Sequence, residues 1–153
     1  MKLQEIAARA TEDSAKELVY FLERTPDDKL ARKPCDTARS ALNIAAECAL
    51  VTSNWVEILA SGTCPAQGEY LSLFSRLDDF TSREEVVLAL NEATTRLTTV
   101  IRDIPDERLS EDLTMFWGET APVGAWLHQV ALHNNYHIGQ IGYIQRLYGD
   151  NQG

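Results

Sequence analysis

Four stretches of the chain repeat apolar residues three and four positions apart, the period of an α-helix, over lengths that no strand reaches. A helix with one apolar face must bury that face, and packing four such helices together is the simplest way to do so. The sequence therefore predicts an all-α fold, a four-helix bundle. The predicted helices cover residues 2–24, 37–60, 82–105 and 123–148.

The helix boundaries are marked by cap and turn residues. Pro26 disfavours helical backbone in the residue before it, so the first helix should end there. Asp36 or Thr37 is predicted to cap the second helix, and Ser82, with Glu85 three residues later, has the spacing of a capping box. The connections after the second and third helices each take roughly 20 residues. We therefore expect long crossover connections rather than a plain up-down-up-down bundle.

Length and charge narrow the possible functions. A chain of 153 residues is long enough for one domain with a buried core, so we expect a single domain over 1–153. Its 23 acidic and 14 basic residues give a net charge of −9, which argues against a nucleic-acid partner or an anionic membrane surface. No segment approaches the roughly 20 apolar residues of a membrane span. Three cysteines without paired spacing indicate reduced thiols and a cytoplasmic location.

The second predicted helix contains one unusual residue. Residues 40–56, SALNIAAECALVTSNWV, include a single charged side chain, that of Glu47. An unpaired buried charge is costly, so Glu47 must reach solvent or a partner. Ser40, Asn43, Glu47 and Asn54 share one helical stripe, which faces either water or a polar pocket between helices.

The last predicted helix contains HNNYH, in which His133 and His137 are four residues apart and share one face. The spacing matches the H-E-x-x-H motif, but Asn134 replaces the glutamate that acts as general base, so we set a metalloprotease aside. Glu47 from the facing helix is a candidate third ligand. Two imidazoles and one carboxylate suit Zn²⁺ with an open position, or Fe²⁺, Mn²⁺ or Ni²⁺. Asn43 and Gln140 are candidate outer partners that orient a ligand.

Three segments of the chain resemble the DinB-like superfamily, which includes the bacillithiol-, mycothiol- and glutathione-dependent bacterial transferases. The most specific is FWGETAPVGAWLHQVALHNNYHIGQIGYIQRLYG, with its H-x-x-x-H-x-G-Q run. ARSALNIAAECALV resembles the family's second-helix signature, and PDDKLARKP resembles its first connector. The resemblance implies a four-helix bundle that is often a homodimer and holds one divalent metal through three histidines.

Carried over by position, the resemblance makes His133 and His137 two of the metal ligands. The third position, counted seven residues on from Ser40, is Glu47 instead of histidine; a slip of one residue would place Ala46 or Cys48 there. His128 lies five residues before His133, on another side of the helix, and is expected to be structural or at an interface rather than a ligand.

Two functions follow as expectations. The first is a metal-dependent enzyme, a hydrolase or thiol S-transferase, acting on a small molecule with a divalent metal that activates water or a low-molecular-weight thiol. The alternative is a non-catalytic binding or dimerisation module in which Glu47 and the two histidines form a degenerate site. The sequence identifies no catalytic side chain apart from the metal ligands.

Overall fold

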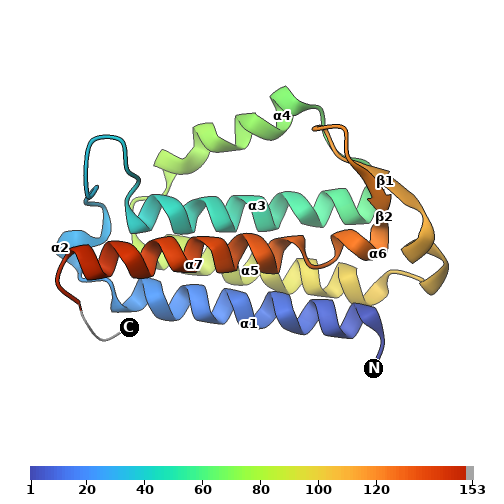
Figure 1. The fold of residues 1–153 in the computed structure, drawn as a ribbon, viewed down its shortest axis with the longest axis horizontal. Coiled ribbons are helices and arrows are strands. Elements are labelled where there is room, and N and C mark those ends of the chain that lie inside the picture. Colours follow the sequence, from blue (N-terminus) through green and yellow to red (C-terminus); the bar gives the residue numbers. More distant parts are fainter. Residues whose placement is uncertain (151–153) are drawn as a thin grey trace.

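The protein is a four-helix bundle, as the sequence predicts. The computed structural model describes residues 1–150, and in that range four long helices pack side by side (Figure 1). They are α1 (Leu3–Arg24), α3 (Ala41–Ser61), α5 (Arg83–Asp103) and α7 (Gln129–Leu147). Among the described residues, no helix combines the length and hydrophobicity needed to cross a membrane.

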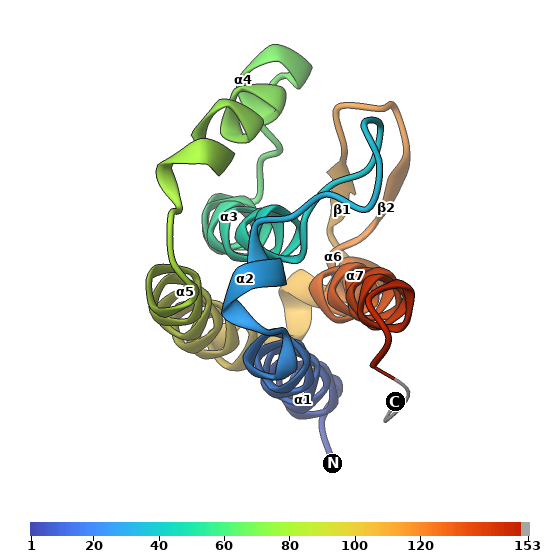
Figure 2. The same ribbon diagram turned by 90° about the vertical axis from the view of Figure 1, so that its left-hand side faces the viewer.

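The order of the helices around the bundle departs from a simple up-down-up-down arrangement. Viewed along the bundle, α1 and α3 lie on one diagonal and α5 and α7 on the other, so α3 contacts mainly α5 and α7 (Figure 2). The colours of Figure 1 show that α3 and α5 run in the same direction, opposite to α1 and α7. The ion pair between Glu57 and Arg96, with 2.9 Å between Oε1 and Nη2, joins matching ends of α3 and α5. A connection between parallel helices must run back along the bundle, which explains its length.

Short elements fill the long connections. The segment between α3 and α5, which has no clear periodicity in the sequence, forms two short helical pieces that lie over α3 (Figure 1). The segment before α7, predicted to be extended or looped, contains a two-stranded antiparallel hairpin in which Leu113 faces Ala121. The short elements are α2 (Asp27–Leu30), α4 (Gln67–Ser72), η1 (Leu73–Asp79), η2 (Asp106–Ser110), β1 (Asp112–Thr114), β2 (Thr120–Pro122) and α6 (Val123–Trp126).

Two helix boundaries correct the sequence prediction. The last helix is not continuous over 123–148, because it breaks between α6 and α7. Nε1 of Trp126 donates to the carbonyl oxygens of Leu113 and Ala121, each at 3.1 Å, and so ties α6 to the hairpin. The cap of α3 is Ser40 rather than Asp36 or Thr37, since its Oγ accepts from the backbone N–H of Asn43 at 3.1 Å. The capping box at Ser82 is confirmed.

A polar layer crosses the middle of the core. One apolar cluster lies at the hairpin end and contains Trp55 and Trp126, while the other lies at the opposite end and contains Leu18 and Ile141. Buried polar side chains lie on the helices between these clusters, and the candidate site belongs to the same layer. They include Thr11, Ser14, Glu47, Thr52, Thr94, Thr98, Asn134 and His137.

Candidate metal centre

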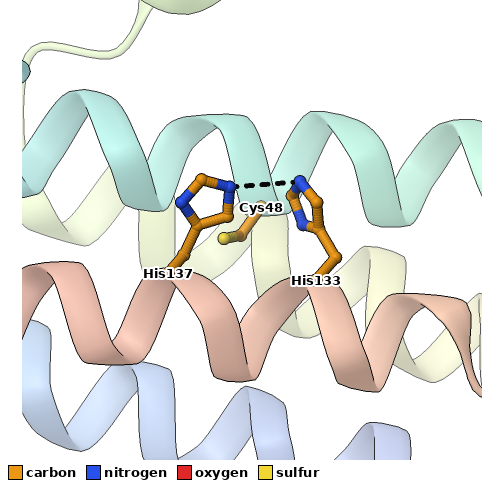
Figure 3. Close-up of side chains that lie close together, drawn as sticks. All are labelled: Cys48, His133 and His137. Atoms are coloured by element: carbon orange, nitrogen blue, oxygen red, sulfur yellow. Dashed lines mark hydrogen bonds between the residues drawn. The ribbon is translucent and has the colours of Figure 1, made fainter.

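The two histidines of HNNYH point from α7 toward α3. His133 and His137 are one helical turn apart, and their Nε2 atoms are 3.2 Å from each other (Figure 3). Asn134 occupies the position of the glutamate in the H-E-x-x-H motif, but it points toward α1. Its Nδ2 donates to Oγ of Ser14 at 3.1 Å. The general base of an H-E-x-x-H metalloprotease is therefore missing from the sequence, and the residue at its position points into the core.

Glu47 completes a three-residue cluster with these histidines. Its Oε1 lies 3.3 Å from Nε2 of His133 and 3.4 Å from Nε2 of His137. Its other oxygen, Oε2, accepts from Nη1 of Arg39. Of the two interpretations of the stripe on α3, the polar pocket between helices therefore applies at Glu47.

Glu47 is negatively charged in this environment. Burial alone would raise the pKa of the carboxyl, but hydrogen bonds with His133 and His137, and the hydrogen bond and positive charge of Arg39, outweigh it. Together they hold the pKa of Glu47 well below its usual range. The cluster thus offers one anionic oxygen and two imidazole nitrogens.

The spacing of these three atoms fits a divalent ion. Zinc binds nitrogen and oxygen ligands at about 2.0–2.1 Å in tetrahedral geometry, which places neighbouring ligand atoms about 3.3 Å apart. Oε1 of Glu47 and the two Nε2 atoms are separated by 3.2, 3.3 and 3.4 Å. The donor set also suits Fe²⁺, Mn²⁺ and Ni²⁺. The residues present therefore fit the metal that the family resemblance implies.

Cys48 is a second candidate partner of the histidine pair. Its sulfur and the ring nitrogens of His133 and His137 lie within 4.8 Å of one another, and the thiol sits between the two rings in Figure 3. Burial raises the pKa of the Cys48 thiol well above its usual range, and the negative charge of Glu47 adds to this effect. Glu47 differs from Cys48 in that its carboxyl oxygen is held in the charged form that binds a metal.

Gln140 contacts one of the histidines. Its Oε1 lies 2.7 Å from Nδ1 of His137. When Nδ1 carries the proton of a neutral ring, the lone pair of Nε2 faces Glu47 and His133, which is the orientation that a metal ligand needs. Nδ1 of His133, by contrast, is buried and has no hydrogen-bond partner among residues 1–150.

Asn43 binds Arg39, and Arg39 in turn binds Glu47. Nε of Arg39 donates to Oδ1 of Asn43 at 2.8 Å, and Nη2 donates to the Asn43 carbonyl at 3.0 Å. Arg39, held in this way, binds Glu47. Sequence reasoning missed Arg39 because it precedes the first turn of α3, where helical periodicity gives no information about which way a side chain points.

The remaining candidates lie outside the cluster. His128 is exposed at the start of α7, away from the cluster. Asn54 continues the stripe of Glu47 on α3, but its Nδ2 is buried without a hydrogen-bond partner in the described part of the chain. The histidine pair is therefore contacted by Glu47, and Cys48 lies beside it.

Solved structures with the same fold carry names that refer to metals and thiols. YfiT from Bacillus subtilis, described as a probable metal-dependent hydrolase with an unusual four-helix bundle topology, superposes with a TM-score of 0.79 at 16% identity, covering 95% of this chain and 87% of that one. A mycothiol-dependent maleylpyruvate isomerase superposes with a TM-score of 0.73 at 11% identity, covering 93% of this chain and 61% of that one. YjoA from Bacillus subtilis, described as DinB-like, gives 0.70 at 14% identity, covering 95% and 94%. At these identities the likeness shows the fold alone.

Sequence comparison identifies the family directly. No curated protein matches the chain. The model of the DinB superfamily, however, matches residues 10–141, which include α3, the hairpin and both histidines of HNNYH. This match covers most of the 153 residues, and the bundle topology agrees with it. The chain belongs to the DinB superfamily.

Proposed function

We propose that this protein is a metal-dependent enzyme that acts on a small molecule at a centre formed by Glu47, His133 and His137. The observation that carries the proposal is the spacing of one carboxylate oxygen and two imidazole nitrogens, 3.2 to 3.4 Å apart. The same fold in a probable metal-dependent hydrolase and in a mycothiol-dependent isomerase supports it.

Each residue of the centre has a distinct task. Glu47, His133 and His137 would hold a divalent ion with one position left open, and such an ion would lower the pKa of water or of a thiol there. Glu47 contributes a negative charge to the ligand set, and Arg39 holds its distal oxygen so that Oε1 stays directed at the histidines. Gln140 keeps the proton of His137 on Nδ1 and its Nε2 lone pair free.

The two reactions that suit such a centre are hydrolysis and transfer of a low-molecular-weight thiol. Both begin when a nucleophile, water or thiol, loses its proton, and neither needs a further nucleophilic side chain. Among the described residues, Cys48 is the thiol nearest the centre, but its burial and raised pKa make it a poor nucleophile.

The test uses untagged protein loaded with Zn²⁺, Ni²⁺, Mn²⁺ or Fe²⁺. It is assayed on activated esters and amides, and on an electrophile together with glutathione, bacillithiol or mycothiol. His137→Ala should lower kcat/KM by about a hundredfold or more, because loss of a ligand costs at least as much as loss of an outer partner. His128→Ala is the matched control, since this exposed histidine lies outside the cluster.

Two results would contradict the proposal. One is no turnover with any of these substrates by any metal-loaded wild-type sample. The other is a turnover that His137→Ala leaves intact.

A non-catalytic role is the second candidate, and the position of Cys48 favours it. If Cys48 joined Glu47 and the two histidines, the ion would have four protein ligands, the arrangement of structural zinc sites. A closed site leaves no position for water or thiol, so the bundle would act as a binding or dimerisation module.

A further inference from the structure

A cavity of about 400 Å³ adjoins the candidate metal centre. It lies between the connector that precedes α3 and the C-terminal half of α7, and its volume is within the range of small-molecule sites. Much of its wall is hydrocarbon, contributed by Ile44, Ile144 and Leu147. The cavity therefore suits a ligand with an apolar body.

Two polar side chains of the cavity wall connect it to the centre. Arg39 lines the cavity and hydrogen-bonds Glu47, while Gln140 lines it and hydrogen-bonds His137. A molecule in the cavity would thus contact the same side chains that orient two of the three candidate ligands. The position is that of a substrate beside a reactive centre.

The charge of the cavity indicates the ligand's polar group. Arg39 is the one charged residue among the described residues that line it, and no carboxylate lines it. A guanidinium has five N–H donors, and in Arg39 three of them bind Asn43 and Glu47. The Arg39 side chain is 37% exposed, so the remaining donors are available to a ligand. Because Glu47 already balances most of this charge, a singly charged oxyanion such as a carboxylate fits better than a phosphate dianion.

We infer that this cavity binds a small carboxylic acid with a hydrocarbon body, its carboxylate at Arg39 and its chain against Ile144 and Leu147. The inference names a substrate class for the proposed function. The role of the ligand as substrate rests on that function, whereas its binding does not.

Cys35 provides a direct readout, because it lines the cavity and is exposed. The other two cysteines are internal references: Cys64 packs against the apolar cluster at the hairpin end, and Cys48 is fully buried. Alkylation by iodoacetamide, followed residue by residue with peptide mass spectrometry, therefore compares cavity protection with background reactivity in one sample.

The probes are hexanoate and its neutral analogue hexanamide, added to the full chain with and without zinc. Hexanoate should slow alkylation of Cys35 but not of Cys64. Half-maximal protection should occur at a concentration about tenfold lower than for hexanamide, since a hydrogen bond to a charged group changes affinity by a factor of ten or more.

Two variants at exposed leucines form a matched pair. Leu88 on α5 and Leu147 on α7 are both more than half exposed, but only Leu147 lines the cavity. Leu147→Glu adds a negative charge to the wall and should weaken protection by hexanoate about tenfold, while Leu88→Glu should leave it unchanged.

Equal protection by hexanoate and hexanamide, or no protection of Cys35 by either, would overturn the inference. So would protection that Leu147→Glu and Leu88→Glu change alike. None of these results affects the metal content or the His137→Ala comparison, so failure of the cavity and failure of the metal centre remain distinguishable.

Discussion

At the scale of single residues, two neighbours on α3 compete for the same histidines. Glu47 presents a charged oxygen 3.3 and 3.4 Å from the two Nε2 atoms, and Cys48 presents a buried thiol within 4.8 Å of the same rings. A bound ion keeps an open position if only one of them is a ligand, and loses it if both are. A carboxylate in place of histidine also adds a negative charge to the ligand set.

Binding of Co²⁺ distinguishes ligation by Glu47 from ligation by Cys48, because a thiolate ligand gives Co²⁺ an intense charge-transfer absorption in the near ultraviolet. We predict that the Co²⁺ protein lacks this absorption. Glu47→Gln should weaken Co²⁺ binding by about 10- to 100-fold or more, whereas Cys48→Ala should leave it unchanged. A charge-transfer band in the wild type that disappears in Cys48→Ala would instead identify Cys48 as a ligand.

The sequence could predict the cluster but not the side chain that holds it. Helical spacing placed His133 and His137 on one face, and the single charge in residues 40–56 singled out Glu47. Arg39 was not predictable, because it lies in a loop and its direction depends on contacts with Asn43 and Glu47 that form only in the folded chain. That Glu47 is a metal ligand stays a prediction.

At the scale of elements, α7 does two things: it presents the histidines to α3 and packs closely on α1. Gly142 lies in the closest contact, since a Cβ at this position would come within 3.0 Å of Cε1 of Phe21. Gly139, on the exposed side of the same helix, has nothing within 4 Å of its Cβ position. The two glycines therefore differ in packing while sharing the same helical backbone.

Alanine at these two glycines should have different effects. Gly139→Ala should raise the free energy of unfolding by about 0.5–1 kcal/mol, the helix propensity gained. Gly142→Ala gains the same propensity but pushes Cβ against the Phe21 ring, so it should be less stable than Gly139→Ala by about 1 kcal/mol or more. Urea unfolding of both variants measures the difference. Equal stabilities would show that α1 and α7 are less closely packed than described.

Element boundaries were predictable where the signal is local. The capping box at Ser82 needs residues only three apart, and it was found. The sequence does not predict the break between α6 and α7, where bonds from Trp126 to the hairpin join residues that approach each other only after folding. The cap of α3 was misplaced because Asp36, Thr37 and Ser40 all favour capping, and only the structure shows which one is used.

At the scale of the whole molecule, the long connections have a structural reason that periodicity cannot supply. Four amphipathic helices predict a bundle, and connections of roughly 20 residues predict crossovers. The fit between the helix faces decides which helices lie on a diagonal. It also decides that α3 runs parallel to α5. This arrangement makes α3 and α7 neighbours, and so brings Glu47 to the histidines.

The homodimer expected from the family resemblance stays a prediction, and α7 offers a surface for it. Four large apolar side chains on this helix are more than half exposed: Leu132, Tyr136, Tyr143 and Leu147. Their positions are symmetric about Gly139 and Gln140, so an antiparallel copy would pair Leu132 with Leu147 and Tyr136 with Tyr143. A two-fold interface requires this kind of self-complementarity.

We predict that the wild type has twice the chain mass of 17.1 kDa in size-exclusion chromatography with light scattering. Tyr136→Glu should reduce it to a single chain mass, because the pair of charges introduced would be buried in the interface. Leu88→Glu, at an exposed leucine on α5, is the control and should stay dimeric. A wild type that is monomeric at all concentrations would contradict the dimer.

The central claim is that Glu47, His133 and His137 hold one divalent metal, and elemental analysis tests it most directly. Untagged wild type, His137→Ala and His128→Ala are purified without chelator and analysed side by side. We predict about one transition metal per chain in the wild type and in His128→Ala, and none in His137→Ala. No metal in the wild type, even after soaking with Zn²⁺, Ni²⁺, Mn²⁺ and Fe²⁺, would contradict the account.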